Sequence, residues 1–187
     1  MNLYKCLSNQ VYTNLEYSIA PIRFEDRFNI MKWRNEQMYH LRQMKTLTTQ
    51  DQDNYFKNII NPLFEETHPS QILFSYLKGD KCIGYGGLVH INWVDKNAEI
   101  SFIMATELEV ENFQFHWLNF LKLIEVCAFT QLNLHKIYTY AFDLRPNLYS
   151  ALEESNYNEN VRLKEHCFYN GKFIDVVIHS KFNNVKF

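Results

Sequence analysis

The chain of 187 residues is 47% hydrophobic and 21% charged, a balance that is typical of one globular domain and excludes a disordered chain. Its formal net charge is −2, so we expect neither nucleic acid nor an anionic membrane as the main partner. The first residues carry no secretory signal and no apolar run is long enough to cross a membrane, which predicts a cytoplasmic protein.

Four cysteines lie far apart in the sequence and form no C-x-x-C pair, at Cys6, Cys82, Cys127 and Cys167. This spacing predicts reduced, mostly buried thiols, and neither a disulfide framework nor a zinc site. The seven histidines are scattered too, without the i, i+4 spacing that places two ligands on one helix face. We therefore expect no metal site.

The first third of the chain predicts one strand and two helical segments. Residues 17–23 predict a strand, in which Pro21 indicates an edge position or a bulge. A short helical face follows at residues 28–33. Residues 48–60 predict a helix with N-cap chemistry at its start, and we expect Pro62 to stop it.

The middle of the chain predicts three strands and a long helix. Residues 71–77 and 81–90 predict two strands joined by a tight turn at residues 78–81, and residues 97–104 predict a third. Apolar residues then recur at steps of three and four along residues 111–129. That spacing predicts an amphipathic helix with one face on the core.

The last third predicts a strand, a short helix and a closing hairpin. The strand covers residues 132–142 and the helix residues 148–154. Residues 162–169 and 173–180 flank Asn170-Gly171, the strongest short hairpin signal in the chain. The elements together indicate one mixed α/β domain.

This order of elements resembles the acyl-CoA-dependent N-acetyltransferase (GNAT) superfamily over most of the chain, from about residue 17 to residue 182. Residues 81–88 look like the family's third strand, and residues 98–102 look like its fourth, which lies beside the reacting thioester. Residues 132–137 are similar to the entry into its fifth strand. Residues 161–175 resemble the branch that acts on ribosomal proteins and nucleotide-linked amino sugars.

The resemblance implies a single GNAT-like domain over residues 1–187, with a mixed central sheet of six to seven strands flanked by about four helices. It also implies an enzyme that moves an acetyl group from acetyl-CoA, its co-substrate, to a primary amine of a small molecule by direct attack. The acceptor class that it suggests is an amino sugar of surface-polysaccharide biosynthesis, nucleotide-linked or free. An N-terminal peptide amine is the competing acceptor, and a homodimer is left open.

The stretch that matches the family's cofactor loop lacks that loop's glycines. Family members carry R/Q-x-x-G-x-G/A there, and glycine lets backbone N–H groups approach the pyrophosphate of the cofactor. No glycine occurs here between Gly87 and Gly171, and bulky residues stand at the matching positions. The resemblance implies cofactor contacts from Ile103, Met104, Asn112, Phe115, Trp117 and Arg145.

Acetyl transfer to an amine needs a base for the amine and an acid for the departing thiolate. Glu99, on the strand beside the reacting centre, is our candidate base or water-ordering residue, and a solvated strand carboxylate is the alternative. His90 is a second candidate base or substrate ligand. Tyr149 is the candidate acid, although the family's tyrosine position falls on Leu152. Arg145 is expected either at the cofactor's phosphates or paired with its neighbour Asp143.

A second reading of the same departures is a protein that no longer catalyses. The missing glycines and the missing tyrosine together favour a GNAT-shaped binding or partner subunit with a degenerate CoA site. In that case Phe113, Phe115 and Trp117 would fill the cofactor groove or face a partner protein.

Overall fold

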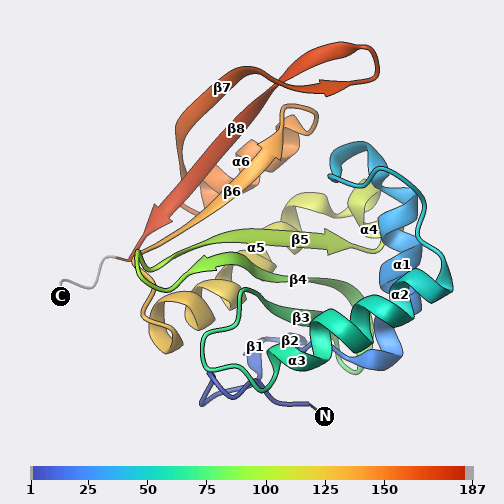
Figure 1. Cartoon of the computed structure of the whole chain (residues 1–187). Helices are drawn as coiled ribbons and strands as arrows, with labels where there is room; N and C mark the ends of the chain where they lie inside the picture. Colours follow the sequence, from blue (N-terminus) through green and yellow to red (C-terminus); the bar gives the residue numbers. More distant parts are fainter. Residues whose placement is uncertain (1, 184–187) are drawn as a thin grey trace.

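The computed structural model describes residues 2–183 and contains one eight-stranded sheet with helices on both of its faces (Figure 1). The strand order is β1-β2-β3-β4-β5-β6-β8-β7. The described sheet therefore has one strand more than the upper end of the predicted six to seven. The extra strand is β1 (Tyr12–Asn14), a three-residue edge strand too short for a clear alternating pattern. Residues 1 and 184–187, which the single-domain prediction includes, lie outside the described residues.

Neighbouring strands in this sheet are antiparallel at every pair except β5 and β6, which are parallel. The remaining strands are β2 (Tyr17–Pro21), β3 (Ile72–Lys78), β4 (Lys81–Asn92), β5 (Asn97–Met104), β6 (Lys136–Phe142), β7 (Asn158–Tyr169) and β8 (Lys172–Phe182). Asn170 and Gly171, with φ of 47° and 79°, form the β7–β8 turn and confirm the predicted hairpin.

Helices α1–α3 cover one face of the sheet, while α5 and α6 lie on the other (Figure 1). Their bounds are α1 (Arg27–Glu36), α2 (Thr49–Tyr55), α3 (Asn61–Leu63), α4 (Thr106–Glu111), α5 (Phe113–Glu125) and α6 (Pro146–Glu154). The structure therefore has more helices than the four expected. The extra segments arise because α2 and α3 are joined by a π-helical turn and because α4 forms directly before α5.

The helix that Thr48 caps starts where the sequence predicts, but it ends later in the chain than predicted. Thr48 and Asp51 form a capping box, in which each side chain accepts from the other residue's backbone N–H. Pro62 does not stop the helix, which continues to Leu63. A π-helical turn at Phe56–Ile60 precedes the proline. The regular α-helical hydrogen bonds that a proline would break are therefore already absent there.

The core between the sheet and α5 is built from aromatic rings packed on glycines. The rings of Phe102 on β5 and Phe120 on α5 stack with their centroids 4.0 Å apart. Gly86 on β4 pairs with Phe102 and leaves the room that these rings occupy. This packing fixes α5 against the strand that leads to the functional site.

The feature that creates the site is the short contact between β5 and β6. The two strands pair only from Asn97 to Glu99, opposite residues 136–138. On its other edge, β6 pairs with β8 along its whole length, from Lys136 to Phe142. The sheet therefore opens between β5 and β6, and the upper lobe of β6–β8 separates from the rest (Figure 1).

We expect Gly86→Ala to lower the free energy of unfolding by roughly 1–3 kcal/mol, because the added methyl group overpacks the core. A Cβ atom there would lie 2.9 Å from Phe102 Cα and 2.9 Å from Phe120 Cζ, and closer still to a β5 carbonyl oxygen. Urea denaturation measures the change. The control is Gly79→Asn in the β3–β4 turn, where nothing lies within 4 Å and asparagine tolerates φ of +56°. Equal stability of the parent and Gly86→Ala would contradict this account of the core.

Candidate active site

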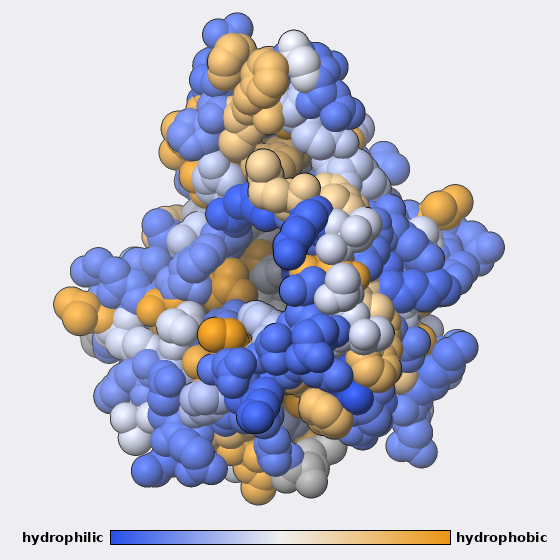
Figure 2. Space-filling view, turned by 45° about the vertical axis from the view of Figure 1, so that its right-hand side comes forward, coloured by the Kyte–Doolittle hydropathy of each residue, from blue (hydrophilic) through white to orange (hydrophobic). Residues whose placement is uncertain are grey.

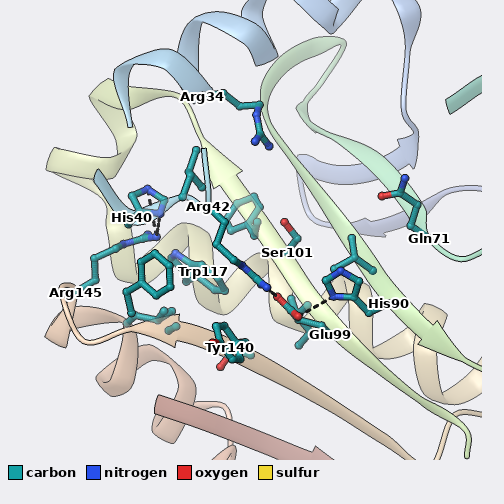
Figure 3. A pocket seen from close by; sticks show the side chains of 18 residues that line it. Arg34, His40, Arg42, Gln71, His90, Glu99, Ser101, Trp117, Tyr140 and Arg145 are labelled. Atoms are coloured by element: carbon teal, nitrogen blue, oxygen red, sulfur yellow. Dashed lines mark hydrogen bonds and ion pairs between the residues drawn. The ribbon is translucent and has the colours of Figure 1, made fainter. Parts of the chain in front are cut away.

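A cavity of about 430 Å³ occupies the opening between β5 and β6. Figure 2 shows a hollow between the upper lobe and the lower body, with a largely hydrophilic rim. Figure 3 shows the side chains around it. Those that carry charge or hydrogen-bonding groups come from α1, the segment after it, β4, β5, α5, β6 and the start of α6, and include Arg34, His40, Arg42, His90, Glu99, Ser101, Trp117, Tyr140 and Arg145.

Glu99 lies in this cavity at the last residue of the β5–β6 pairing. Its side chain is 9% exposed, and both carboxylate oxygens have partners. Arg42 Nη2 donates to Oε1 at 2.6 Å, and His90 Nδ1 lies 2.9 Å from Oε2. The buried, fully bonded carboxylate excludes the alternative of a solvated strand residue.

His90 reaches Glu99 because β4 is irregular there. The β4–β5 register shifts between Val89 and Asn92, and His90 itself has φ of +51°. Its side chain is 63% exposed and lines the cavity beside Glu99. A neutral imidazole that donates from Nδ1 to a carboxylate keeps Nε2 as an acceptor, which is the arrangement of a general base. The two candidate base residues therefore form one hydrogen-bonded pair (Figure 3).

Arg145 lies at the other end of the cavity. It does not pair with Asp143, which was one of the two alternatives that we expected. Its Nη2 is 2.8 Å from Glu109 Oε1, and Nη1 donates to His40 Nδ1 at 2.9 Å. The rings of Phe113 and Trp117 lie 4.9 and 5.9 Å from its guanidinium carbon.

Asp143, the neighbour that was expected to pair with Arg145, has other partners. It accepts hydrogen bonds from Arg162 and Tyr149, which lower the pKa of its carboxyl group. Sequence proximity misled here, because residues 143 and 145 lie in the turn between β6 and α6 and have different partners.

Burial shifts the pKa values of Arg145 and of the two residues that contact it, Glu109 and His40. It raises the pKa of Glu109 and lowers that of Arg145, because both ions lose water. Burial, and next the charge of Arg145, lower the pKa of His40 to about 3. His40 is therefore neutral at pH 7 and can accept the hydrogen bond from Arg145.

Tyr149, the candidate acid, lies outside the cavity lining. Its hydroxyl donates to Asp143 Oδ1 at 2.7 Å, and its ring stacks on His179. Leu152, at the family's tyrosine position, is fully buried. The cavity has another phenol, Tyr140 on β6, whose pKa is raised by burial. Sequence reasoning missed Tyr140, and the only available signal was its place on the strand that leaves the β5–β6 pairing.

Two of the six residues expected at the cofactor line this cavity, Trp117 and Arg145. Ile103 and Met104 are buried in the core. Asn112 and Phe115 line a separate groove of about 750 Å³ beside α1. The positions matched to the family's cofactor loop lie at the start of α5, directly after α4.

Backbone amides in this region are used within the protein. Leu108 and Glu109 donate to Ala105 O at 2.9 and 3.1 Å, and Asn112 donates to Leu108 O at 3.0 Å. These three N–H groups are therefore bonded and do not form the open backbone cradle of a glycine-rich loop.

The cavity nevertheless has polar atoms that fit an amide- and phosphate-bearing ligand. Trp117 Nε1, Thr139 Oγ1 and Arg145 Nε are buried and have no hydrogen-bond partner within residues 2–183. All three residues line the cavity. Buried polar groups are normally hydrogen-bonded, so a ligand with several acceptors suits this wall.

Two kinds of feature, a membrane-spanning helix and a metal-binding cluster, are absent from residues 2–183. None of the helices there combines the length and the apolar character that a bilayer crossing requires. Within the same range, no group of three or more histidine, cysteine, aspartate or glutamate side chains comes together that could hold a metal ion.

A family model, the acetyltransferase (GNAT) domain, matches residues 19–178. The chain belongs to this family. Its predicted fold class, its enzyme class of N-acetyltransferase and the use of acetyl-CoA as co-substrate are thereby confirmed at the level of the family.

Individual relatives are polyamine enzymes. The chain is 33% identical over 106 residues to spermidine N(1)-acetyltransferase of Vibrio cholerae serotype O1; the alignment covers 54% of this chain and 60% of that relative, less than two thirds of its length. Among solved structures, spermidine N-acetyltransferase from Vibrio cholerae with CoA and spermine has a TM-score of 0.79, with 22% identity, 91% of this chain and 97% of that chain covered. A dodecameric structure of the same Vibrio enzyme has a TM-score of 0.74, with 22% identity over 91% of this chain and 95% of that one.

These relatives do not belong to the branch that the tail of the sequence suggested. They are named for spermidine, whereas we expected enzymes for ribosomal proteins or nucleotide-linked amino sugars. The sequence of residues 161–175 in the β7–β8 hairpin therefore indicates the superfamily fold and not one class of acceptor.

We expect acid to destabilise the protein partly through His40. Its pKa is about 3 in the folded protein against an ordinary 6.5, so below pH 6.5 the unfolded chain binds a proton that the folded protein does not. The free energy of unfolding then falls with pH by up to about 1.4 kcal/mol per unit for this residue.

Urea denaturation from pH 7.5 to 5 measures this slope. His40→Asn, which keeps a hydrogen-bond acceptor for Arg145, should lose this part of the slope, while His68→Asn on an exposed loop should keep it. Identical slopes in the parent and His40→Asn would contradict the burial of a neutral His40.

Proposed function

We propose that this protein is an active N-acetyltransferase that transfers the acetyl group of acetyl-CoA to a primary amine of a small molecule. The observation that carries the proposal is the His90–Glu99 pair at the point where β5 and β6 separate. A base must lie beside the reacting amine. The His90–Glu99 pair lies at the opening between β5 and β6, which connects the two faces of the sheet.

His90 is the residue that we assign as the base, with Glu99 as its orienting partner. Acetyl-CoA supplies the reactive thioester. His90 Nε2 takes the proton from the amine as the new C–N bond forms, and the Glu99 carboxylate stabilises the resulting imidazolium. The C–S bond breaks, and the thiolate takes a proton, for which Tyr140 replaces Tyr149 as our candidate donor.

Acetyl-CoA would lie on the α5–α6 side of the cavity. Trp117 and Arg145 line that side and carry buried N–H groups without partners in the described chain. We retain these two as cofactor-binding residues. Ile103, Met104, Asn112 and Phe115 lie in the core or in the other groove and are not part of this proposal.

An amino sugar, nucleotide-linked or free, remains our proposed acceptor, with an N-terminal peptide amine as the competitor. The relatives named above act on polyamines, and similarity alone would favour spermidine. The charges of the cavity argue otherwise. Arg34, Arg42 and Arg145 line it together with one carboxylate, Glu99, so a polyamine that carries several positive charges would be repelled.

The second candidate function is a binding or partner subunit without catalysis. The observation in its favour is that Asn112, Phe115 and Trp117 stand where the family's cofactor loop has its arginine and glycines. Against it, Trp117 and Phe113 do not fill the opening, because a cavity of about 430 Å³ remains beside them. We leave a homodimer open as the assembly, and light scattering of the purified chain measures the oligomeric state.

The first test is calorimetric titration of acetyl-CoA into the purified protein, followed by measurement of CoA thiol release with amino sugars. We expect binding in about the micromolar to sub-millimolar range that is ordinary for enzyme substrates, and turnover with a primary amine. Undetectable binding at millimolar acetyl-CoA would instead support the partner-subunit function.

The second test concerns the base. We expect His90→Gln to lower kcat/KM by roughly 100-fold or more, and to remove the loss of activity toward acid that a histidine base produces. Acetyl-CoA affinity should not change. His68→Gln is the matched control, because His68 contacts Trp93 outside the cavity. An unchanged pH profile in His90→Gln would contradict its role as the base.

A further inference from the structure

The three arginines of the cavity differ in their partners. Arg42 pairs with Glu99 at 2.6 Å, and Arg145 pairs with Glu109 at 2.8 Å. Arg34 lines the same cavity and has no carboxylate within 4.0 Å anywhere in residues 2–183. One guanidinium of the cavity is therefore not neutralised by the part of the chain that the structure describes.

The hydrogen bonds of Arg34 go to neutral groups. Its Nη1 donates to the hydroxyl of Tyr85 at 2.7 Å, and its Nε donates to Gln43 Oε1 at 3.0 Å. These bonds hold the guanidinium in one orientation while leaving Nη2 without a hydrogen bond in the described chain. The side chain is half-buried, and removing a cation from water without an anion is costly. Its place in the last turn of α1 offsets part of that cost through the helix dipole.

Arg34 also lies on the face of the sheet where an acceptor would enter. It comes from α1, which covers the face opposite α5 and α6, and Figure 3 shows it pointing from α1 toward the cavity. Glu99 and Ser101 of β5 line the same cavity at alternate positions of one strand. Arg145 and Trp117, which we assign to acetyl-CoA, line the opposite side.

We propose that Arg34 binds an anionic group, a phosphate or a carboxylate, carried by the acceptor, and so selects amines that have such a group. This inference rests on the proposed acetyltransferase function. A guanidinium with a free edge donates well to both anions, and each charge-assisted hydrogen bond contributes about 1.5–3 kcal/mol. Phosphorylated or nucleotide-linked amino sugars are therefore preferred over free sugars, and polyamines are rejected.

The experiment compares acceptors that differ in one group. Glucosamine 6-phosphate and glucosamine form the phosphate pair, serine and serinamide form the carboxylate pair, and spermidine is the polycation. CoA thiol release gives kcat and KM for each. We expect an advantage of roughly 10- to 100-fold in kcat/KM for the anionic member of at least one pair, mostly in KM, and the least activity with spermidine. The pair that shows the advantage identifies the anion.

Variants test whether Arg34 causes this preference. Arg34→Gln should remove the advantage of the anionic acceptor, lowering kcat/KM for the anionic member by roughly 10- to 100-fold more than for the neutral member. Arg34→Lys, which keeps the charge but not the fork, should retain part of it and covers the case in which Arg34→Gln does not fold. Arg162→Gln, a change of an arginine in the β7–β8 hairpin outside the cavity, is the matched control and should behave as the parent.

Three results separate the two proposals. If the parent acetylates none of the amines and does not bind acetyl-CoA, the proposed function itself fails. If it acetylates glucosamine or spermidine as well as the anionic acceptors, the function stands and the inference about Arg34 is wrong. The inference is also wrong if the preference for anions survives unchanged in Arg34→Gln.

Discussion

The site depends on one constraint, the three-residue contact between β5 and β6. Strand β6 is paired with β8 over seven residues on one of its edges, but with β5 over only three residues on the other. The sheet therefore opens after Glu99. This opening places a buried carboxylate at the edge of a cavity, gives α5 and α6 access from one side, and gives α1 access from the other (Figure 3).

Charge is distributed across the opening in pairs with one exception. Glu99 is held between Arg42 and His90, and Glu109 is held by Arg145. Each of these ion pairs is buried on at least one side, so each fixes side chains from different elements relative to one another. Among the cavity arginines of residues 2–183, Arg34 alone has no carboxylate partner. In our proposal, this unequal pairing of the arginines disfavours a polycation as the acceptor.

The sequence allowed much of the fold to be predicted, because turns and alternation are local signals. Asn170-Gly171 and the tight turn after β3 fixed two hairpins, and the spacing of apolar residues located α5. Glu99 was found because it lies on a strand with clear alternation, and His90 because it ends the neighbouring strand; the irregularity of β4 that brings His90 to Glu99 could not be predicted. Arg34 and Tyr140 were missed as site residues, since only the packing of α1 and the divergence of β6 bring them to the cavity. The partner of Arg145 could not be predicted, because Glu109 belongs to α4, a helix that the sequence pattern did not predict.

That additional helix, α4, changes how the cofactor side of the site must work. In a glycine-rich loop, backbone N–H groups supply the positive charge for a diphosphate. In this protein, bulky side chains stand where the glycines would be, and the amides of Leu108, Glu109 and Asn112 are bonded within α4 and the turn after it. In the function that we propose, cofactor binding relies on side chains such as Arg145 and Trp117, whose buried N–H groups have no partners among the described residues. Because Glu109 already pairs with Arg145, a phosphate bound at Arg145 would have to compete with that carboxylate, and the pair would then set the affinity for the cofactor.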